Sequence, residues 1–278
     1  MKSDYLKHIE ERKQTNLPPL ALNAEQAKSV VEHLIAADDN DFYLDLLTHR
    51  IPPGVDEAAY VKASFLASVA KGEQVCAAIS QQQATFLLGT MMGGYNIEPL
   101  IDLLDLEVTA QTATDALSKT LLIYEAYQTV LEKSANNAFA KQVVDAWANG
   151  DWFTAKNKLP EEIKLTVFRV EGEINTDDLS PATEAWSRPD IPLHAQSMLV
   201  KKMDNPLETI AKLKEKNLPL AFVGDVVGTG SSRKSAINSV LWHMGNDIDY
   251  VPNKRGGGVV LGGNIAPIFF NTAEDSGA

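Results

Sequence analysis

The 278-residue chain changes its residue pattern once along its length, near Lys158-Leu159-Pro160, and this change most constrains its fold. Before that point, apolar residues recur at helical spacing, and few β-branched runs alternate with polar residues. After it, alternating apolar runs and short apolar runs followed by glycines predict strands. The sequence therefore predicts two domains, a helical one over residues 1–158 and an α/β one over residues 159–278.

The first domain is predicted to be a series of short helices. Apolar residues recur every three or four positions over residues 24–37, and Asn23 is a good N-cap residue for that helix. Further helices are predicted over residues 42–47, 55–70, 80–88, 97–104, 110–124 and 137–148. Short helices joined by tight Pro/Gly turns favour an α-solenoid of the HEAT type. The chain shows no clean sequence period, so an ordinary helical bundle is the alternative.

The second domain is predicted to combine strands, glycine turns and a helix. Strands are predicted over residues 163–170, 218–223 and 259–261, and a helix over residues 232–244, which carry a buried apolar face. No closing strand is visible after the last predicted strand. We therefore expect an α/β domain that is incomplete at its C-terminal end.

Composition narrows the class of protein. The chain is 45% hydrophobic and 22% charged, and no run of about 18 apolar residues predicts a membrane span. Its charged start, MKSDYLKHIEERKQ, does not match a signal peptide, so a cytoplasmic location is expected. The net charge of −12 disfavours nucleic-acid binding over the whole surface and leaves a local basic patch open.

Cysteine usage excludes several kinds of site. Cys76 is the only cysteine, so this chain forms no intrachain disulfide, cysteine-rich zinc site or all-cysteine iron–sulfur cluster. It lies among small and apolar residues, and we interpret it as a structural thiol.

The stretch GDVVGTGSSRKSAINSVLW, residues 224–242, carries the first chemical motif. Gly228 and Gly230 permit positive φ angles, and a helix starting near Ser232 would present free N–H groups to an anion. Arg233 could add a bidentate contact to a carboxylate or phosphate. Neither the P-loop pattern nor GxGxxG fits these residues. The alternative interpretation is a glycine turn with a serine N-cap and a surface arginine.

A second polar stretch, GEINTDDLSPATEAWSRPDIPLHA, covers residues 172–195. Asp177 and Asp178 could cap a turn or orient an arginine, and Arg188 is the nearby candidate. His194 could act as an acid–base group. Because no carboxylate lies at a fixed helical spacing from it, we favour a packing role for His194.

Long segments of the sequence resemble a known family. The stretches NTDDLSPATEAWSRPDIPLHA, GDVVGTGSSRKSAINSVLW and VPNKRGGGVVLGGNIAPIFFNT resemble the swivel domain of the bacterial aconitase B family, also described as aconitate hydratase 2 or 2-methylisocitrate dehydratase. Residues 50–63 and LLGTMMGGYNIEPLI, residues 87–101, resemble the N-terminal HEAT-like domain of the same family. The resemblance covers essentially the whole chain.

The resemblance implies roles for particular residues. By the match, Ser231 is the base that removes the substrate proton, and Ser232 and Arg233 bind substrate oxygens. Arg188 resembles a second arginine that binds a substrate carboxylate, and Asp177 matches an aspartate that supports the active-site groups. Two arginines at a helix start suit a trianionic substrate, and a serine base needs such a cationic setting because its own pKa is high.

The resemblance also implies a cofactor and partners. Family members hold a [4Fe-4S] cluster, and its cysteine ligands would lie beyond residue 278, so no metal ligand is expected in this chain. The implied reaction interconverts citrate and isocitrate through cis-aconitate in the tricarboxylic acid cycle, with 2-methylisocitrate as a second family substrate. The cluster-bearing domains of the same polypeptide are the expected partners. A homodimer through the helical domain and mRNA binding without the cluster are further expectations.

Two functions from different classes remain open on the sequence. The first is a hydro-lyase segment that works only when joined to the cluster domains, so the isolated chain is predicted to be inactive. The second is a stand-alone module for protein interaction, dimerisation or RNA binding, with a regulatory fragment as a variant of it.

Overall fold

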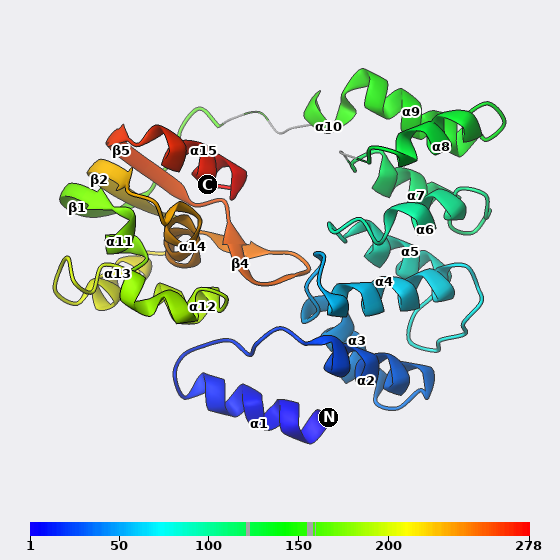
Figure 1. Ribbon diagram of the computed structural model, residues 1–278, viewed down its shortest axis with the longest axis horizontal. Coiled ribbons are helices and arrows are strands. Elements are labelled where there is room, and N and C mark those ends of the chain that lie inside the picture. Colours follow the sequence, from blue (N-terminus) through cyan, green and yellow to red (C-terminus); the bar gives the residue numbers. More distant parts are fainter. Residues whose placement is uncertain (121–122, 155–157, 159) are drawn as a thin grey trace. The chain divides into compact units, whose positions relative to one another are not determined.

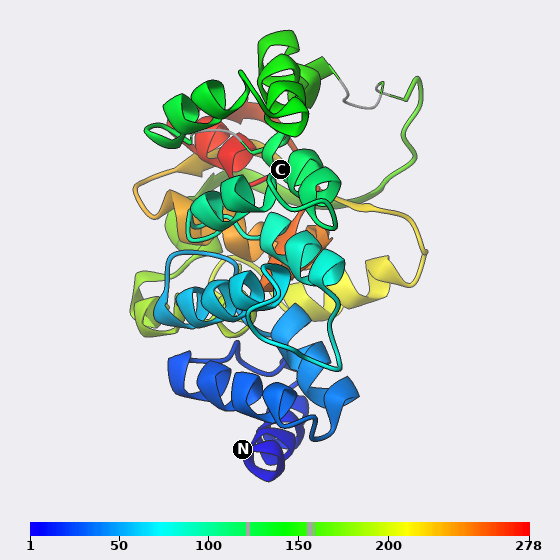
Figure 2. The same ribbon diagram turned by 90° about the vertical axis from the view of Figure 1, so that its right-hand side faces the viewer.

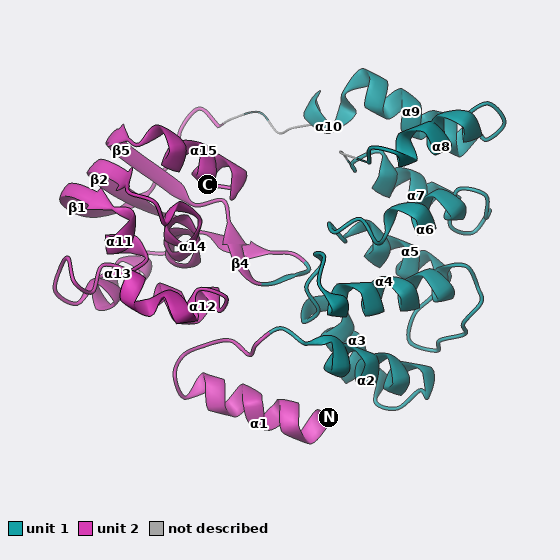
Figure 3. Cartoon of the chain, in the orientation of Figure 1, with its two compact units in different colours: residues 1, 21–159, 250–252 teal, residues 2–20, 160–249, 253–278 magenta. Residues whose placement is uncertain are grey.

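A computed structural model describes residues 1–120, 123–154, 158 and 160–278, and its contacts divide the chain into two compact units (Figure 3). The helical unit comprises residues 1, 21–159 and 250–252, and the sheet unit comprises residues 2–20, 160–249 and 253–278. The fold is thus a combination of a helical part and a part with a parallel sheet, as expected. The units differ from the predicted domains chiefly in the assignment of residues 2–20.

The helical unit is a succession of short helices (Figures 1 and 2). Its described helices are α2 (Ala24–Ile35), α3 (Asn40–His49), α4 (Glu57–Ala70), α5 (Gln81–Gly89), α6 (Ile97–Leu103), α7 (Ala110–Leu117), α8 (Ala126–Lys133), α9 (Ala138–Asn149) and α10 (Asp151–Thr154). α2 packs on α3 and α4, α4 on α5, α5 on α7, and α7 on α6 and α9. Leucine, valine and alanine side chains between them form the core of this unit.

Local sequence signals place several of these helix starts. The predicted N-cap Asn23 is confirmed, because its side chain accepts a hydrogen bond from the Gln26 N–H in a capping box. The helix predicted over residues 110–124 was too long, since α7 ends at Leu117 and α8 is a separate helix. Residues 121 and 122 of that prediction lie outside the described residues. The HEAT-type assignment stays a prediction.

The sheet unit contains one parallel sheet covered by helices. Its elements are α1 (Lys2–Lys13), β1 (Thr166–Asn175), α11 (Thr176–Leu179), the 3-10 helix η1 (Ala182–Ser187), α12 (Ile191–Ala195), α13 (Pro206–Lys214), β2 (Leu220–Thr229), α14 (Arg233–Met244), β3 (Asn246–Ile248), β4 (Val251–Gly256), β5 (Val259–Ile265) and α15 (Pro267–Asp275). The last residues of β4 belong to this unit and its first two to the helical unit. The strand order of the sheet is β1-β2-β5, with both pairs parallel.

The middle strand and one long helix form the core of the sheet unit. β2 is buried along most of its length, as expected for a central parallel strand. Phe168 of β1 and Phe222 of β2 are paired in register, and their ring centroids lie 6.1 Å apart. Ile237 and Val240 of α14 are fully buried in the same apolar cluster, which also contains Phe269 of α15.

All three strands of the sheet end later than the sequence predicted, and β1 and β2 also begin two or three residues later. β1 reaches Asn175 because Gly172, at φ +76°, forms an irregular step in the register after Val170. The carboxylate of Asp225 accepts a hydrogen bond from the Gly172 N–H at 2.8 Å, which holds this step to β2. Glycines were read as strand ends, whereas here the chain passes through them without leaving the sheet.

The N-terminal helix α1 belongs to the sheet unit, although the sequence placed it with the helical domain. Arg12 forms a bidentate pair with Asp190, with contacts of 2.7 and 3.1 Å, and both side chains are mostly buried. Gln196 donates to the Thr15 carbonyl at 3.1 Å. These partners are about 180 residues apart in sequence, so no local pattern could indicate the pairing.

Candidate functional site

The predicted site residues gather where two parallel strands end. β1 and β2 are neighbours, and the register pairs Asn175 with Thr229, the last residues of the two strands. The segment Thr176-Asp177-Asp178 therefore leaves the same edge of the sheet as the turn Gly230-Ser231-Ser232. The carboxyl ends of parallel strands are the usual place for a ligand in an α/β fold.

Two glycines in this turn meet a conformational demand. Gly228 and Gly230 have φ angles of +84° and +103°, which side-chain-bearing residues rarely adopt. A Cβ atom on Gly228 would lie 2.1 Å from Cγ of Phe269, and one on Gly230 would lie 2.6 Å from Oγ1 of Thr176. The turn is therefore packed tightly against both α15 and the start of α11.

The start of α14 is held by Thr176 and Arg188. The Ser232 N–H donates to Thr176 Oγ1 at 3.2 Å, and Arg188 Nη2 donates to Ser232 Oγ at 3.0 Å. Ser232 occupies the N-cap position, but its side chain makes no capping hydrogen bond. The glycine turn and the N-cap position of the alternative interpretation are thus confirmed, but the capping hydrogen bond is not, and the hydroxyl accepts from Arg188 instead.

Two arginines at this edge have no acidic partner among the described residues. In the described part of the chain Arg188 and Arg233 form no ion pair, whereas Arg12, Arg169 and Arg255 each pair with an aspartate. Nε of Arg188 is also buried with no hydrogen-bond partner among the described residues. An uncompensated guanidinium beside the first turn of α14, whose N–H groups carry a positive partial charge, favours an anionic ligand.

The remaining predicted residues differ in their surroundings. Ser231 is exposed in the turn, and its hydroxyl makes no hydrogen bond with the described residues. Asp177 is also exposed, and its carboxylate has no partner in the described part of the chain. Asp178 forms a capping box with Asn175, which confirms a capping role for one of the two aspartates.

His194 is part of the framework under this edge. It is 2% exposed, and its ring lies within hydrogen-bond distance of Ser180 and Ser187. Burial lowers the pKa of His194 below its ordinary value. The packing role favoured for His194 is confirmed, and an exposed acid–base role is not compatible with this burial.

Sequence reasoning missed the contribution of Thr176. This residue was quoted in the Thr-Asp-Asp stretch, yet it is its hydroxyl that fixes the turn. The sequence carried no such signal, because the predicted strand ended at residue 170 and the burial of Thr176 after β1 is visible only in the structure. Without the strand register, its hydrogen-bond partner could not be named.

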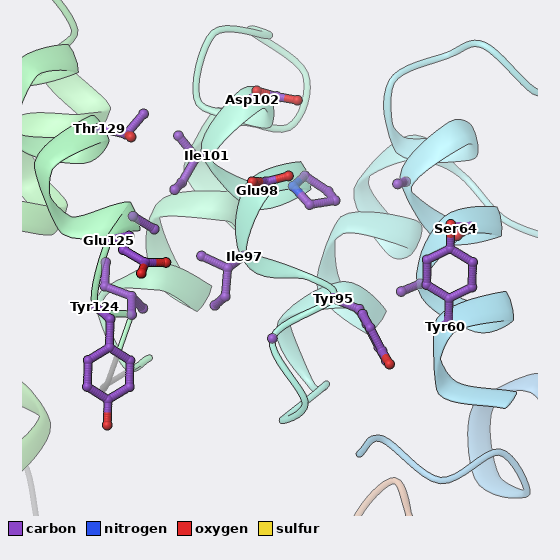
Figure 4. Close-up of a pocket in the computed structure, with 16 residues that line it drawn as sticks. Tyr60, Ser64, Tyr95, Ile97, Glu98, Ile101, Asp102, Tyr124, Glu125 and Thr129 are labelled. Atoms are coloured by element: carbon purple, nitrogen blue, oxygen red, sulfur yellow. The ribbon is translucent and has the colours of Figure 1, made fainter. Parts of the chain in front are cut away.

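A cavity of about 860 Å³ lies in the helical unit and includes none of the predicted site residues. It is an open groove over α4, α6 and α8, with Tyr60 and Ser64 at one side and Tyr124 and Thr129 at the other (Figure 4). Its charged lining residues are all acidic: Glu98, Asp102 and Glu125.

A metal site is not visible in the described residues. They contain no group of three or more His, Cys, Asp or Glu side chains that could hold a metal ion. Cys76 is a free, half-buried thiol of the helical unit. No described helix is long and apolar enough to cross a membrane.

Comparison with protein families covers both units. The family model described as the Aconitate B N-terminal domain matches residues 4–153, more than half of the chain. The chain belongs to the aconitate hydratase B family. A second model, the aconitate hydratase 2 N-terminus, matches residues 165–278. This range includes the ends of β1 and β2 and the candidate site residues beside them.

Individual members of the aconitate hydratase B family are similar over the full chain. Aconitate hydratase B of Synechocystis sp. is 59% identical over 278 residues, which cover 99% of this chain and 32% of the relative. Aconitate hydratase B of Escherichia coli is 55% identical over 291 residues, covering 100% of this chain and 34% of the relative. The chain thus spans about a third of the length of these relatives.

Proposed function

We propose that this chain is the substrate-binding segment of an aconitate hydratase, which interconverts citrate and isocitrate through cis-aconitate. Membership of the aconitate hydratase B family supports the reaction class. The observation that carries the residue assignment is the pair of arginines without acidic partners, Arg188 and Arg233, at the start of α14. The carboxylates of a tricarboxylate would be the negatively charged partners of these two guanidinium groups.

In this proposal the turn binds the substrate through several donors. Arg188 and Arg233 bind carboxylates, and the free N–H groups of the first turn of α14 add hydrogen bonds. The Ser232 hydroxyl accepts from Arg188, so its own hydrogen is available for a substrate oxygen.

Ser231 is the proposed base. As the alkoxide, its Oγ takes a proton from the carbon next to a substrate carboxylate and becomes a hydroxyl. The electrons of that C–H bond form the double bond as the neighbouring C–O bond breaks, and the leaving hydroxyl group takes a proton from an acid outside this chain and departs as water. The alkoxide forms only if its charge is stabilised, and nearby guanidinium groups and a helix start provide that stabilisation. Asp177 is proposed as a supporting residue. Its exposed position means that its contact would form with substrate or with groups outside this chain.

The family's [4Fe-4S] cluster does not fit the residues of this chain. The sequence has one cysteine, and the described residues contain no cluster of metal-ligating side chains. In the proposed enzyme the ligands therefore come from outside these 278 residues, and we assign no step of this chain's chemistry to the cluster. We propose two domains, over residues 1–158 and 159–278. The first is proposed to be a HEAT-like stack of helices.

A chimeric enzyme tests the proposal. The matching segment of Escherichia coli aconitate hydratase B is replaced by this chain, and the absorbance of cis-aconitate formed from isocitrate is followed. We expect turnover from the chimera and none from the isolated chain. Arg233→Lys should raise KM and lower kcat, because lysine lacks the planar fork, while the control Arg169→Lys should change neither. A chimera that folds and assembles its cluster but shows no turnover would contradict the proposal.

A further inference from the structure

The ring of His194 joins three groups of the segment that leads to Arg188. Its Nε2 lies 2.7 Å from Ser180 Oγ, and its Nδ1 lies 2.8 Å from Ser187 Oγ and 3.1 Å from the Glu184 carbonyl oxygen. His194 is in α12, and it is 2% exposed. Both ring nitrogens therefore have partners inside the protein.

The partners determine which nitrogen carries the hydrogen. A carbonyl oxygen only accepts, so the contact with Glu184 requires a hydrogen on Nδ1. Nε2 then has the lone pair and accepts from the Ser180 hydroxyl. The Ser187 hydroxyl donates to the same Glu184 carbonyl at 2.8 Å, so its oxygen is free to accept from Nδ1. Burial keeps this ring neutral.

The segment bound in this way has little regular structure of its own. Ser180 follows α11 and Ser187 ends η1, a 3-10 helix whose Glu184 has non-helical backbone angles. Short 3-10 helices are weakly stabilised by their own hydrogen bonds. The imidazole therefore holds both ends of the segment, and Arg188 follows directly after its second end.

The arginine depends on this placement. Nη2 of Arg188 reaches Ser232 Oγ at 3.0 Å, while its Nε is buried with no partner in the described part of the chain. A buried donor left unpaired is costly, so the backbone before Arg188 must be fixed by other contacts.

We propose that His194 is a positioning residue: as the neutral Nδ1–H tautomer, it fixes Ser187 and the Glu184 carbonyl and thereby aims Arg188 at Ser232 and at a carboxylate ligand. That His194 positions Arg188 is inferred from the contacts alone. That the ligand is a carboxylate depends on the proposed function.

The Nε–H resonance of Arg188 in the ¹⁵N-labelled 278-residue chain provides the test. Arg188→Lys assigns the resonance by its disappearance, and the Nε–H of Arg169, an exposed arginine of β1, serves as the internal reference. In the wild-type chain we expect slow solvent exchange for Arg188. His194→Ala should speed that exchange by about tenfold, the scale of one lost hydrogen bond.

Two further variants separate positioning from general stability. His194→Asn keeps a donor near the Nδ1 position and should preserve slow exchange. His194→Gln keeps a group near Nε2 and should not. If exchange at Arg188 only follows the melting temperature across these variants, or is unchanged in all of them, the proposal is overturned. Should His194→Ala fail to fold, Ser187→Ala replaces it, with the same faster exchange expected.

Titration with tricarballylate, a tricarboxylate, distinguishes this proposal from the proposed function. A wild-type Arg188 resonance that shifts with tricarballylate, and a weaker shift in His194→Gln, support both. A resonance that depends on His194 but ignores tricarballylate supports the positioning role and counts against the proposed ligand. A resonance that responds to tricarballylate equally in all variants overturns the positioning role alone.

Discussion

The turn after β2 and the groove of the helical unit both expose charged side chains, but they differ in how those charges are held. In the turn, Arg188 contacts Ser232 and lies next to a buried histidine–serine network. In the groove, Asp102 already pairs with Lys71 at 2.8 Å, and Glu98 and Glu125 are exposed. Cavity volume points to the groove, whereas uncompensated charge on a buried framework points to the turn.

These two signals point to different regions of the molecule. A guanidinium without an acidic partner, next to a glycine turn that leaves no space for a Cβ atom, is costly for stability alone. We therefore expect substitutions in the turn to affect function and substitutions in the groove to affect it little.

The largest effect is expected for Ser231→Ala in the chimeric enzyme. Loss of a general base should lower kcat by about 10²–10⁴-fold, with a smaller change in KM. The melting temperature should stay the same, because Ser231 is exposed and its hydroxyl makes no hydrogen bond with the described residues. Steady-state kinetics and calorimetry on one preparation check both. A variant with normal kcat would show that Ser231 is not the base, and that the turn does not carry the proposed function.

Gly228→Ala should have the next largest effect, on stability. The added Cβ would lie 2.1 Å from the Phe269 ring at a φ of +84°, so we expect a loss of about 2–5 kcal/mol in the free energy of unfolding. Gly94→Ala in the helical unit is the matched control, since its φ is +91° and its Cβ would meet open space. It should lose only about 1–2 kcal/mol. Equal losses in urea unfolding would mean that Phe269 moves aside.

The pH dependence of stability gives a further test, through the half-buried histidine His243. Burial, with Lys214 and Arg255 nearby, lowers the pKa of His243 in α14 to about 4, and its Nε2–H donates to the Ala195 carbonyl at 2.9 Å. The unfolded chain binds the proton at about pH 6.5, so stability is complete above that pH and is lost as the pH falls toward 4. The loss should approach roughly 3 kcal/mol.

Urea unfolding at several pH values measures this loss, and His243→Gln should flatten the curve between pH 6.5 and 4. If the variant keeps the same slope in that window, another group accounts for the acid sensitivity.

The smallest effect is expected in the groove. Asp102→Asn removes the ion pair with Lys71. The side chain of Asp102 is 59% exposed and that of Lys71 is 29% exposed, so the free energy of unfolding should fall by about 0.2–1 kcal/mol. Activity of the chimera should be unchanged. A loss of activity as large as that of Arg233→Lys would show that the groove, too, serves the reaction.

Much of the architecture could be predicted from local patterns. The change near residue 158 separated helices from strands, and Asn23 and the start of α14 were located within one residue. Strand ends were placed too early: the first predicted strand ended at Val170, and the other two ended before Gly224 and Gly262, while the sheet continues past these positions. A glycine ends a strand or permits a bulge in it depending on the neighbouring strand, which a single sequence does not show.

The residue types and spacing of this chain by themselves determined its two-part organisation, its family resemblance and the chemistry offered by Ser231, Ser232 and Arg233. Only the tertiary structure decided that Thr176 and Arg188 hold the Ser232 turn and that α1 belongs to the sheet unit. Periodicity and capping act within a few residues, whereas the Thr176–Ser232 hydrogen bond and the Arg12–Asp190 pair join residues 56 and 178 positions apart.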